Sequence, residues 1–214
     1  MSSPREVEAK FEADDETQGR LLALEGFGGF KLIERESKIQ DDTYYDTANR
    51  TLRKSGATLR IRRRSSGAQM TFKGERQTAG DSHVVSRLED EVDLDASSIA
   101  GLDGETPLML PVEPRPLERA RTLSATEALT PMARLVTQRS VLLFGDGAGN
   151  QVEVSVDRCE ATRLEDGRVV RFSEVELEPK RGEADALLVA AAALEKAVEG
   201  LTPSTKTKLE RALR

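Results

Sequence analysis

Carboxylates occupy alternate positions in two segments of the chain, and arginines occupy alternate positions in a third. In a β-strand this spacing places the repeated side chains on one face, since successive residues point to opposite sides. Like charges aligned in this way repel one another unless something neutralises them. The acidic positions are Glu6 and Glu8, then Glu174, Glu176 and Glu178, and the arginines are Arg60, Arg62 and Arg64.

The residue types indicate which ligands would neutralise these faces. Oxygen ligands favour Mg²⁺ or Mn²⁺ over zinc, and the forked guanidinium of arginine suits phosphate oxygens. A divalent cation together with a polyphosphate is the simplest ligand that satisfies both kinds of face. The alternative is a sheet with one face in water, over which charged side chains are scattered. That alternative accounts for each strand taken singly, but it does not account for the segregation of charges by strand.

The period of the apolar residues predicts the elements that would position these groups. Strict alternation predicts strands over residues 6–12, 58–64, 70–75, 87–93, 135–144, 152–158, 168–172 and 173–178. Helical spacing predicts helices from Asp14 or Asp15 to about Gly26, over residues 183–198, and from Ser204 or Thr205 through Leu213. Residues 96–133 hold five of the eight prolines and are expected to mix loop with short helix. This order of elements is typical of α+β folds rather than of βαβ winding.

The apolar faces of the predicted strands explain why the chain also needs helices. In the first strand Val7, Ala9 and Phe11 lie opposite the charged residues. If the strands close into a barrel, the charged faces line the lumen and the apolar faces meet amphipathic helices outside it. We therefore predict one α+β domain over residues 1–214, built as a closed β-barrel with a charged lumen.

Composition excludes several classes of protein. The 214-residue chain has a net charge of −6, which argues against a general nucleic-acid binder. Its single cysteine, Cys159, excludes a disulfide framework, and its single histidine, His83, excludes histidine-based zinc sites. We expect Cys159 to be a structural thiol and His83 to lie in a solvated loop. No run of about 18 apolar residues and no signal-peptide pattern occur, so we expect a cytoplasmic protein without a membrane span.

Ordered motifs along nearly the whole chain resemble those of the CYTH domain family, also called triphosphate tunnel metalloenzymes. The N-terminal Glu6-Val-Glu-Ala-Lys10 is similar to the E-x-E-x-K motif that opens these domains. The further matching segments are Tyr44-Tyr-Asp-Thr47, Leu52-Arg-Lys-Ser-Gly56, Leu59-Arg-Ile-Arg62, Thr71-Phe-Lys73, Arg87-x-Glu-x-Glu91, Arg139, Val156-Asp157, Glu174-Val-Glu-Leu-Glu178 and Lys206. The resemblance implies an eight-stranded antiparallel tunnel, of the bacterial inorganic triphosphatase kind that is often fused to a CHAD domain.

The resemblance also implies a role for each matching residue. Glu6 and Glu8, together with Glu174, Glu176 and Glu178, would bind the divalent cation that bridges a triphosphate, and Asp157 would bind a second cation near the attacking water. The residues implied to hold phosphate oxygens are Lys10, Arg60, Arg62, Lys73, Arg139 and Lys206. The implied catalytic residues are Lys10, Arg60, Arg62 and Asp157. Arg87, Glu89 and Glu91 are expected to support them from positions that face the lumen, and Arg53 and Arg134 are expected at the surface.

The implied chemistry is metal-dependent hydrolysis of a phosphoanhydride, with two divalent ions, Mg²⁺ or Mn²⁺, during turnover. Recognition of an adenine or a thiazolium usually takes aromatic stacking, and this chain has no Trp, six Phe and two Tyr. We therefore expect inorganic tripolyphosphate, cleaved to pyrophosphate and phosphate, as the substrate. Three alternatives remain open: a polyphosphate- or nucleotide-binding module with little turnover, a thiamine triphosphatase, and a class IV adenylate cyclase.

Overall fold

The computed structural model describes residues 5–78, 84–100, 102, 105–125, 127–182 and 185–214. The strands in these ranges are β1 (Arg5–Glu12), β2 (Gly26–Phe27), β3 (Phe30–Asp46), β4 (Thr58–Arg64), β5 (Gly67–Thr78), β6 (Val84–Asp95), β7 (Thr130–Gly145), β8 (Gln151–Arg163), β9 (Val169–Arg181) and β10 (Thr202–Pro203). The helices are α1 (Asp15–Leu22), α2 (Thr51–Lys54), α3 (Arg115–Ser124), α4 (Ala186–Ala197) and α5 (Lys208–Ala212).

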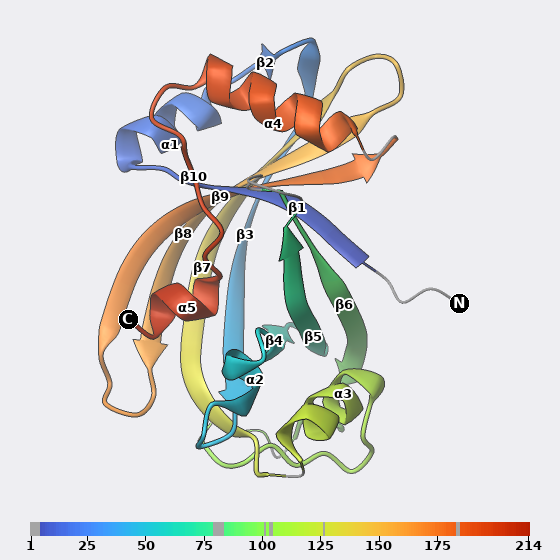
Figure 1. Ribbon diagram of the computed structural model, residues 1–214, viewed down its shortest axis with the longest axis vertical. Helices are drawn as coiled ribbons and strands as arrows, with labels where there is room; N and C mark the ends of the chain where they lie inside the picture. Colours follow the sequence, from blue (N-terminus) through green and yellow to red (C-terminus); the bar gives the residue numbers. More distant parts are fainter. Residues whose placement is uncertain (1–4, 79–83, 101, 103–104, 126, 183–184) are drawn as a thin grey trace.

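Eight of these strands form one closed antiparallel barrel. They follow the order β1-β6-β5-β4-β3-β7-β8-β9 around the ring, and the ring closes because β1 pairs on both sides. Residues 5–9 of β1 pair with β6, and residues 9–11 pair with β9. The short strands β2 and β10 pair only with β3 and β1. The structure therefore confirms the predicted α+β fold, an eight-stranded antiparallel barrel with helices packed around it (Figure 1).

The short strands β2 and β10 were not predicted, and two of the eight barrel strands also differ from the sequence-based prediction. Alternation did not reveal β3, which has 17 residues, because charged residues lie on both of its faces where it is exposed, from Glu34 to Lys38. In contrast, β9 is one continuous strand where two were predicted. Its inner face is apolar at Phe172 and acidic from Glu174 onward, although both residues lie on that same face. Phe172 lies there under the guanidinium of Arg211, 4.5 Å from the ring centroid, so the apolar pattern shifts phase within one strand.

The outer faces of the barrel are covered by two groups of helices. Leu187 of α4 packs with Phe11 and Val175 over the outside of β1 and β9. On the opposite side Leu117 of α3 packs with Met70 over the outside of β5. Figure 1 shows α1 and α4 together at one end of the long axis and α2 and α3 at the other. Each such side chain contributes about 1.5–3 kcal/mol when fully buried, and this burial holds the strands closed around a polar lumen.

Capping residues in the sequence explain where the helices α1 and α5 begin. The predicted cap Asp14 accepts a hydrogen bond of 2.8 Å from the Thr17 backbone N–H, so α1 begins at Asp15. At the other end of the chain, Thr207 and Glu210 form a reciprocal capping box. As a result α5 begins at Lys208, later than the predicted start after Ser204 or Thr205. None of the described helices has the length and apolar character that crossing a membrane requires.

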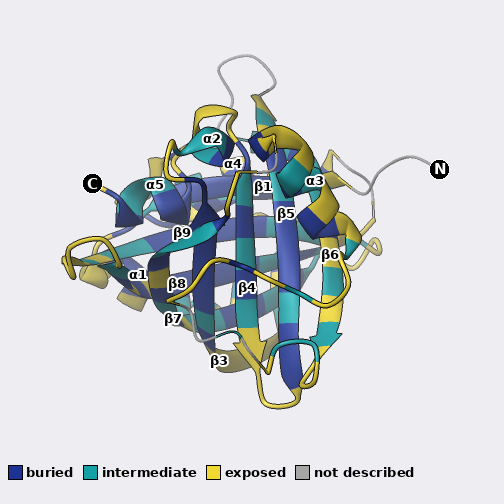
Figure 2. Ribbon diagram, turned by 90° about the horizontal axis from the view of Figure 1, so that it is seen from below, coloured by how far each residue is buried: buried dark blue, intermediate teal, exposed yellow. Residues whose placement is uncertain are grey.

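The last helix, α5, differs from the others because it packs against the inner side of the barrel wall. Leu209 lies in a buried cluster with Leu135 and Cys159. By alternation these two residues share their strand faces with Arg139 and Asp157, which point into the lumen. Figure 2 shows buried residues along most of β5 and β8 and exposed residues in the connecting loops. Apolar packing of α5 therefore covers one end of the lumen.

Candidate functional site

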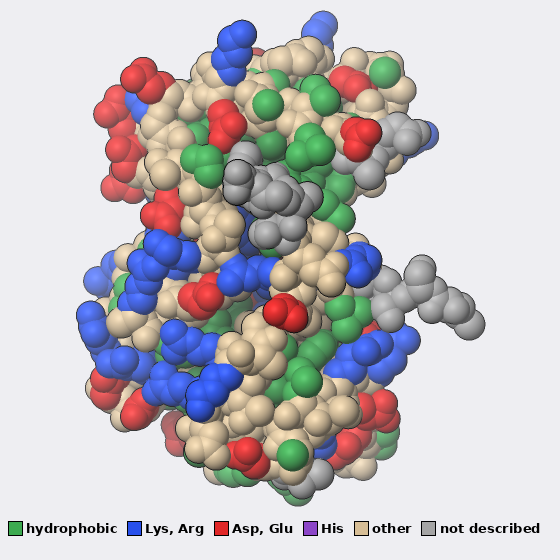
Figure 3. All heavy atoms as spheres, in the orientation of Figure 1, with side chains coloured by type: hydrophobic (Ala, Val, Ile, Leu, Met, Phe, Trp, Pro, Cys, Tyr) green, Lys and Arg blue, Asp and Glu red, His purple; other side chains and the backbone are tan. Residues whose placement is uncertain are grey.

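The barrel lumen holds a cavity of about 430 Å³ whose lining is almost entirely charged or polar. Its basic residues are Lys10, Lys38, Arg60, Arg62, Arg64, Lys73, Arg87, Arg139, Lys180 and Lys208, and its acidic residues are Glu6, Glu89, Glu91, Glu153, Glu176 and Glu178. Basic groups therefore outnumber acidic ones by ten to six in this lining, although the whole chain is acidic. On the face seen in Figure 3, Lys and Arg side chains also gather around the middle of the molecule. Four more carboxylates, those of Glu8, Asp42, Asp157 and Glu174, are buried behind this lining and pair with its cations. The lumen thus suits an anion that is accompanied by a divalent cation.

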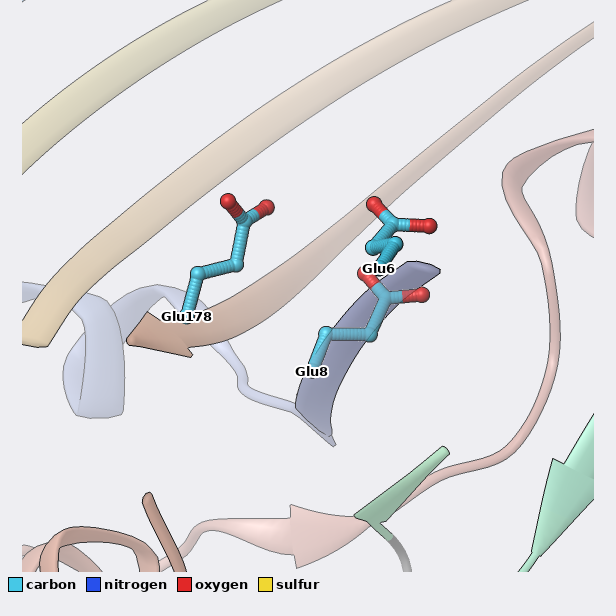
Figure 4. A group of neighbouring side chains, drawn as sticks. All are labelled: Glu6, Glu8 and Glu178. Atoms are coloured by element: carbon cyan, nitrogen blue, oxygen red, sulfur yellow. The ribbon is translucent and has the colours of Figure 1, made fainter. Parts of the chain in front are cut away.

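Glu6, Glu8 and Glu178, the first acidic group, come from β1 and β9, and their carboxylate oxygens lie within 4.8 Å of one another. Figure 4 shows the three side chains reaching to the same side of these strands. Glu6 accepts hydrogen bonds from Lys73 Nζ at 2.5 Å and from Arg87 Nε at 2.8 Å. Burial alone would raise the pKa of Glu6, but these two cations outweigh it and lower the pKa to about 2. Glu6 is therefore a carboxylate at neutral pH.

Asp157, Glu174 and Glu176, the second acidic group, come from β8 and β9 and are all buried. Three cations surround them. The ammonium of Lys208 lies 2.9, 2.6 and 2.8 Å from oxygens of Asp157, Glu174 and Glu176. Lys10 Nζ donates to Glu176 at 2.6 Å, and Arg139 makes a bidentate pair with Asp157 and a further bond to Glu176. Each of the two groups offers only oxygen donors, a set that suits Mg²⁺ or Mn²⁺.

The cations of the second acidic group shift its pKa values unequally. Burial raises the pKa of Glu174, and the charges of Lys208 and Lys10 only partly offset it. For Glu176, burial is overcome by Lys10 and Lys208, so its pKa lies well below the usual range. Burial would lower the pKa of Lys208, but the carboxylates around it raise it well above the ordinary value. Within the group, burial therefore outweighs the cations at Glu174, and the cations outweigh burial at Glu176.

The arginine wall consists of Arg60 and Arg62 of β4 with Asp42 of β3. Register places Asp42 opposite Arg62, and the two make a bidentate pair at 2.7 and 2.9 Å. Arg60 is less well paired, because its nearest approach to Asp42 is 3.5 Å and its buried Nε has no hydrogen-bond partner. Burial would raise the pKa of Asp42, but Arg60 and Arg62 lower it below its usual range. Arg60 thus lines the lumen with a guanidinium whose ion pairs, to Asp42 and Glu91, are both 3.5 Å or longer.

The structure brings most of the sequence-predicted site residues together in the lumen. Those that line the cavity or belong to its acidic groups are Glu6, Glu8, Lys10, Arg60, Arg62, Lys73, Arg139, Asp157, Glu174, Glu176 and Glu178. The expected supporting residues Arg87, Glu89 and Glu91 also line it. Outside the lumen, Arg134 pairs with Asp41, and Arg53 is not among the lining residues. His83 lies outside the described residues.

Lys206 is not in the lumen, so its predicted position was wrong. Its side chain is 46% exposed, and its ammonium lies 3.8 Å from Glu12 outside the cavity. Lys208 instead reaches the second acidic group, because the capping box at Thr207 starts α5 there and turns the first helical residue inward. The spacing of Thr207 and Glu210 is the sequence signal that would have identified Lys208.

Sequence reasoning also missed Asp42, whose side chain is fully buried. It lies on β3, the strand that alternation did not reveal, so nothing local marked it as a partner of Arg62. The structural prediction for Cys159 is consistent with its buried position. Burial raises the pKa of this thiol to about 12, so it is protonated at neutral pH.

Comparison with known proteins places these observations in a family. The sequence profile of the CYTH domain matches residues 4–213, and no curated protein matches the chain. Among solved structures, a suspected adenylyl cyclase from Hippeastrum, described as having a dominant triphosphatase activity, has a TM-score of 0.69 at 16% identity. That similarity covers 97% of this chain and 95% of the other.

Two further solved structures share the fold at low sequence identity. A suspected adenylate cyclase from Bacillus halodurans has a TM-score of 0.63 at 21% identity and covers 100% of both chains. The triphosphatase of the Mimivirus capping enzyme has a TM-score of 0.51 at 10% identity, with 91% of this chain and 90% of the other covered. All three comparisons agree with the observed barrel.

Proposed function

We propose, because the chain belongs to the CYTH domain family, that it is a metal-dependent triphosphatase that cleaves inorganic tripolyphosphate to pyrophosphate and phosphate. The observation that carries the proposal is the weakly paired guanidinium of Arg60, which lines a cavity bordered by two groups of carboxylates. Its terminal nitrogens lie 3.5 Å from Asp42 and 3.9 Å from Glu91, longer than a close charge-assisted bond. A phosphate oxygen in the cavity would give these nitrogens a closer partner.

The basic side chains of the lumen would divide the oxygens of a triphosphate among them. Arg60 and Arg62 lie on β4, and Lys73 lies on β5 opposite Thr58, so these three form one continuous strip. Lys10, Arg139 and Lys208 approach from the other side of the lumen. Phosphoryl transfer depends mainly on positioning and on neutralising charge. We infer that the strip on β4 and β5 holds the leaving pyrophosphate, because Asp42 already orients its guanidinium groups.

The carboxylates fit the divalent cation that this family implies. Glu6, Glu8 and Glu178 offer oxygens within 4.8 Å of one another, and Glu6 and Glu178 line the same cavity as the basic strip. Asp157, with Glu174 and Glu176, would hold a second ion. When bound, such ions withdraw charge from phosphate oxygens and lower the pKa of bound water. Arg87 would keep Glu6 and Glu8 oriented, since it donates to both.

The lining favours a bare triphosphate over a nucleotide or thiamine triphosphate. Among the described lining residues, Tyr44 is the one aromatic side chain, and it is buried. It packs in the apolar cluster under α5, so its ring faces are not free to stack on a base. Without such a platform, recognition of a nucleobase would lose about 1–3 kcal/mol. Inorganic tripolyphosphate needs no such contact.

Phosphate release with Mg²⁺ and with Mn²⁺ tests the proposal, comparing tripolyphosphate, ATP, thiamine triphosphate and long-chain polyphosphate at equal concentration. We expect metal-dependent release from tripolyphosphate at least tenfold faster than from the other three. Faster release from ATP or thiamine triphosphate would assign a different substrate. Formation of cyclic AMP would favour a cyclase, the activity suspected of two of the structural neighbours. Tight binding of polyphosphate without release from any substrate would replace the enzyme by a binding module.

A further inference from the structure

The ammonium of Lys208 lies at the centre of the second acidic group. An ammonium has three donors, and Lys208 Nζ lies within 2.9 Å of one oxygen from each of three carboxylates. It donates hydrogen bonds to Glu174 and Glu176 and forms an ion pair with Asp157. The position that a cation shared by these carboxylates would take is filled by a side chain of the protein itself.

The first acidic group is neutralised in a different way. Arg87 of β6 donates to Glu6 and Glu8, and Lys73 of β5 donates to Glu6. Lys10 Nζ lies 3.5 Å from Glu8, farther than its 2.6 Å bond to Glu176. The ion pair of Glu178 is with Lys180, whose side chain is 38% exposed. Among the described residues, no single ammonium lies within 4.0 Å of all three carboxylates of this group. The centre of the first acidic group thus remains available to an ion.

Lys208 is held at its position by the fold rather than by its ion pairs alone. It is the first residue of α5, and the capping box between Thr207 and Glu210 fixes that helix start. The next residue, Leu209, is buried against Leu135 in the cluster that closes the end of the lumen. The backbone at residue 208 is therefore anchored. Only the side chain would need to move to vacate the second acidic group.

We propose that Lys208 serves as a built-in substitute for the second divalent cation. In the absence of substrate the protein then binds one ion, at the first acidic group. A second ion enters the second acidic group only after phosphate oxygens attract the Lys208 ammonium away from its carboxylates. This inference rests on the proposed function, because it concerns the ions that accompany the triphosphate. The position of the Lys208 side chain would then determine the order in which the two ions bind.

Mn²⁺ binding in the absence of any phosphate compound tests the proposal, with free and bound Mn²⁺ counted by electron paramagnetic resonance. We expect one equivalent on the wild-type protein and two on Lys208→Met, the second binding at least tenfold more tightly than any second equivalent on wild type. Lys206→Met is the matched control: it removes the same charge two residues away, from an exposed side chain, and should keep one equivalent. Two tight equivalents on the wild type, or one on Lys208→Met, would overturn the proposal.

Lys208→Met leaves three buried carboxylates with only Lys10 and Arg139 as cationic partners, so its stability needs a separate measurement. We expect its melting temperature to be lower than that of wild type without metal and to rise more on addition of Mn²⁺. If this variant does not fold, the wild-type protein provides the test. One bound equivalent of Mn²⁺ that becomes two on addition of imidotriphosphate, with spin-coupled lines in the spectrum, supports the proposal. Two equivalents before that addition contradict it. Because none of these readouts involves turnover, a protein that hydrolyses no triphosphate would refute the proposed function without altering this result.

Discussion

The arginine wall and the second acidic group lie on opposite sides of one lumen, and they neutralise their charges to different extents. In the arginine wall Asp42 of the adjacent strand pairs with both guanidinium groups, and Glu91 adds only a distant contact of 3.9 Å to Arg60. In the second acidic group three carboxylates meet three cations, Lys10, Arg139 and Lys208. The acidic side is thus balanced by the protein itself, whereas the basic side keeps an excess of positive charge.

This difference separates the two tasks of the lumen. On the basic side the ion pairs of Arg60 are 3.5 and 3.9 Å long, so this guanidinium can accept an anion without first breaking a close pair. On the acidic side, a cation at the second group must displace an ion pair, so the first group is the easier place for it to bind. Changes on the basic side should therefore alter affinity for triphosphate. Changes on the acidic side should alter ion binding and turnover.

The largest expected effect comes from Glu8→Gln in the first acidic group. We expect kcat to fall at least about 1000-fold, because the ion loses a charged ligand, whereas tripolyphosphate affinity in the presence of EDTA should stay the same or increase. Phosphate release and calorimetry measure the two quantities. The control Glu153→Gln removes a charge from the same cavity, where Glu153 pairs with the partly exposed Lys180, and should change kcat less than about threefold. If metal-dependent turnover survived Glu8→Gln, the assignment of ion binding to the acidic side of the lumen would be wrong.

Asp42→Asn tests whether the arginine wall depends on its internal anion. Removing one partner of a buried ion pair costs about 3 kcal/mol, so we expect the free energy of unfolding in urea to fall by about that amount at pH 7. Addition of tripolyphosphate should restore much of the loss. The control Asp41→Asn, which breaks an exposed pair with Arg134, should cost less than about 1 kcal/mol.

The pH dependence of the Asp42 effect has a definite sign. The pKa of Asp42 is lowered in the folded protein from its ordinary value of 3.8. Its contribution to stability is therefore present above pH 3.8 and is lost as the pH falls below that value. The difference between wild type and Asp42→Asn should accordingly shrink in urea unfolding at pH 3. A difference that did not depend on pH would mean that the Asp42 charge is not what stabilises the wall.

Arg60→Ala tests whether the arginine wall contributes directly to tripolyphosphate affinity. Loss of a charge-assisted bond costs about 2 kcal/mol, so tripolyphosphate affinity measured by calorimetry should fall roughly 30-fold. Arg63→Ala is the matched control, because Arg63 lies on the same strand but is exposed and donates to the Leu102 carbonyl on the outside. Equal effects of the two variants would indicate general attraction by positive charge rather than a site at Arg60.

The sequence predicted the strands whose two faces have different chemistry. Alternation identified β1, β4 and β8, because one face of each is charged and the other packs under a helix. It failed where tertiary packing determines the pattern. The inner face of β9 carries Phe172 only because α5 covers it there, and β3 is exposed along part of both faces.

The site was predictable to the extent that its residues repeat along a strand. Glu6, Glu8, Arg60 and Arg62 stand out for that reason. Asp42 does not, since its role follows from the pairing of β3 with β4, which brings it opposite Arg62. Lys208 lies two residues from the predicted Lys206, because the start of α5 depends on a reciprocal bond between Thr207 and Glu210.

The smallest expected effect concerns Cys159, which marks where the second acidic group ends and the apolar cluster under α5 begins. Its thiol shares a strand face with Asp157 but packs with Leu209. We expect Cys159→Ala to change kcat less than about twofold. If turnover of this variant fell more than tenfold, the catalytic surface would include residues beneath α5, and the second acidic group would not end at Cys159.

The stability contribution of Cys159 should depend on pH in one direction. Burial raises the pKa of its thiol from the ordinary 9.0 to about 12, so the unfolded chain releases this proton at a lower pH than the folded protein does. The contribution is therefore fully present below pH 9 and falls as the pH rises from 9 to 12. Between pH 7 and pH 10, wild type should lose about 1.4 kcal/mol relative to Cys159→Ala in urea unfolding. A constant difference would mean that the thiol is solvated, and that α5 does not seal the end of the lumen beside Asp157.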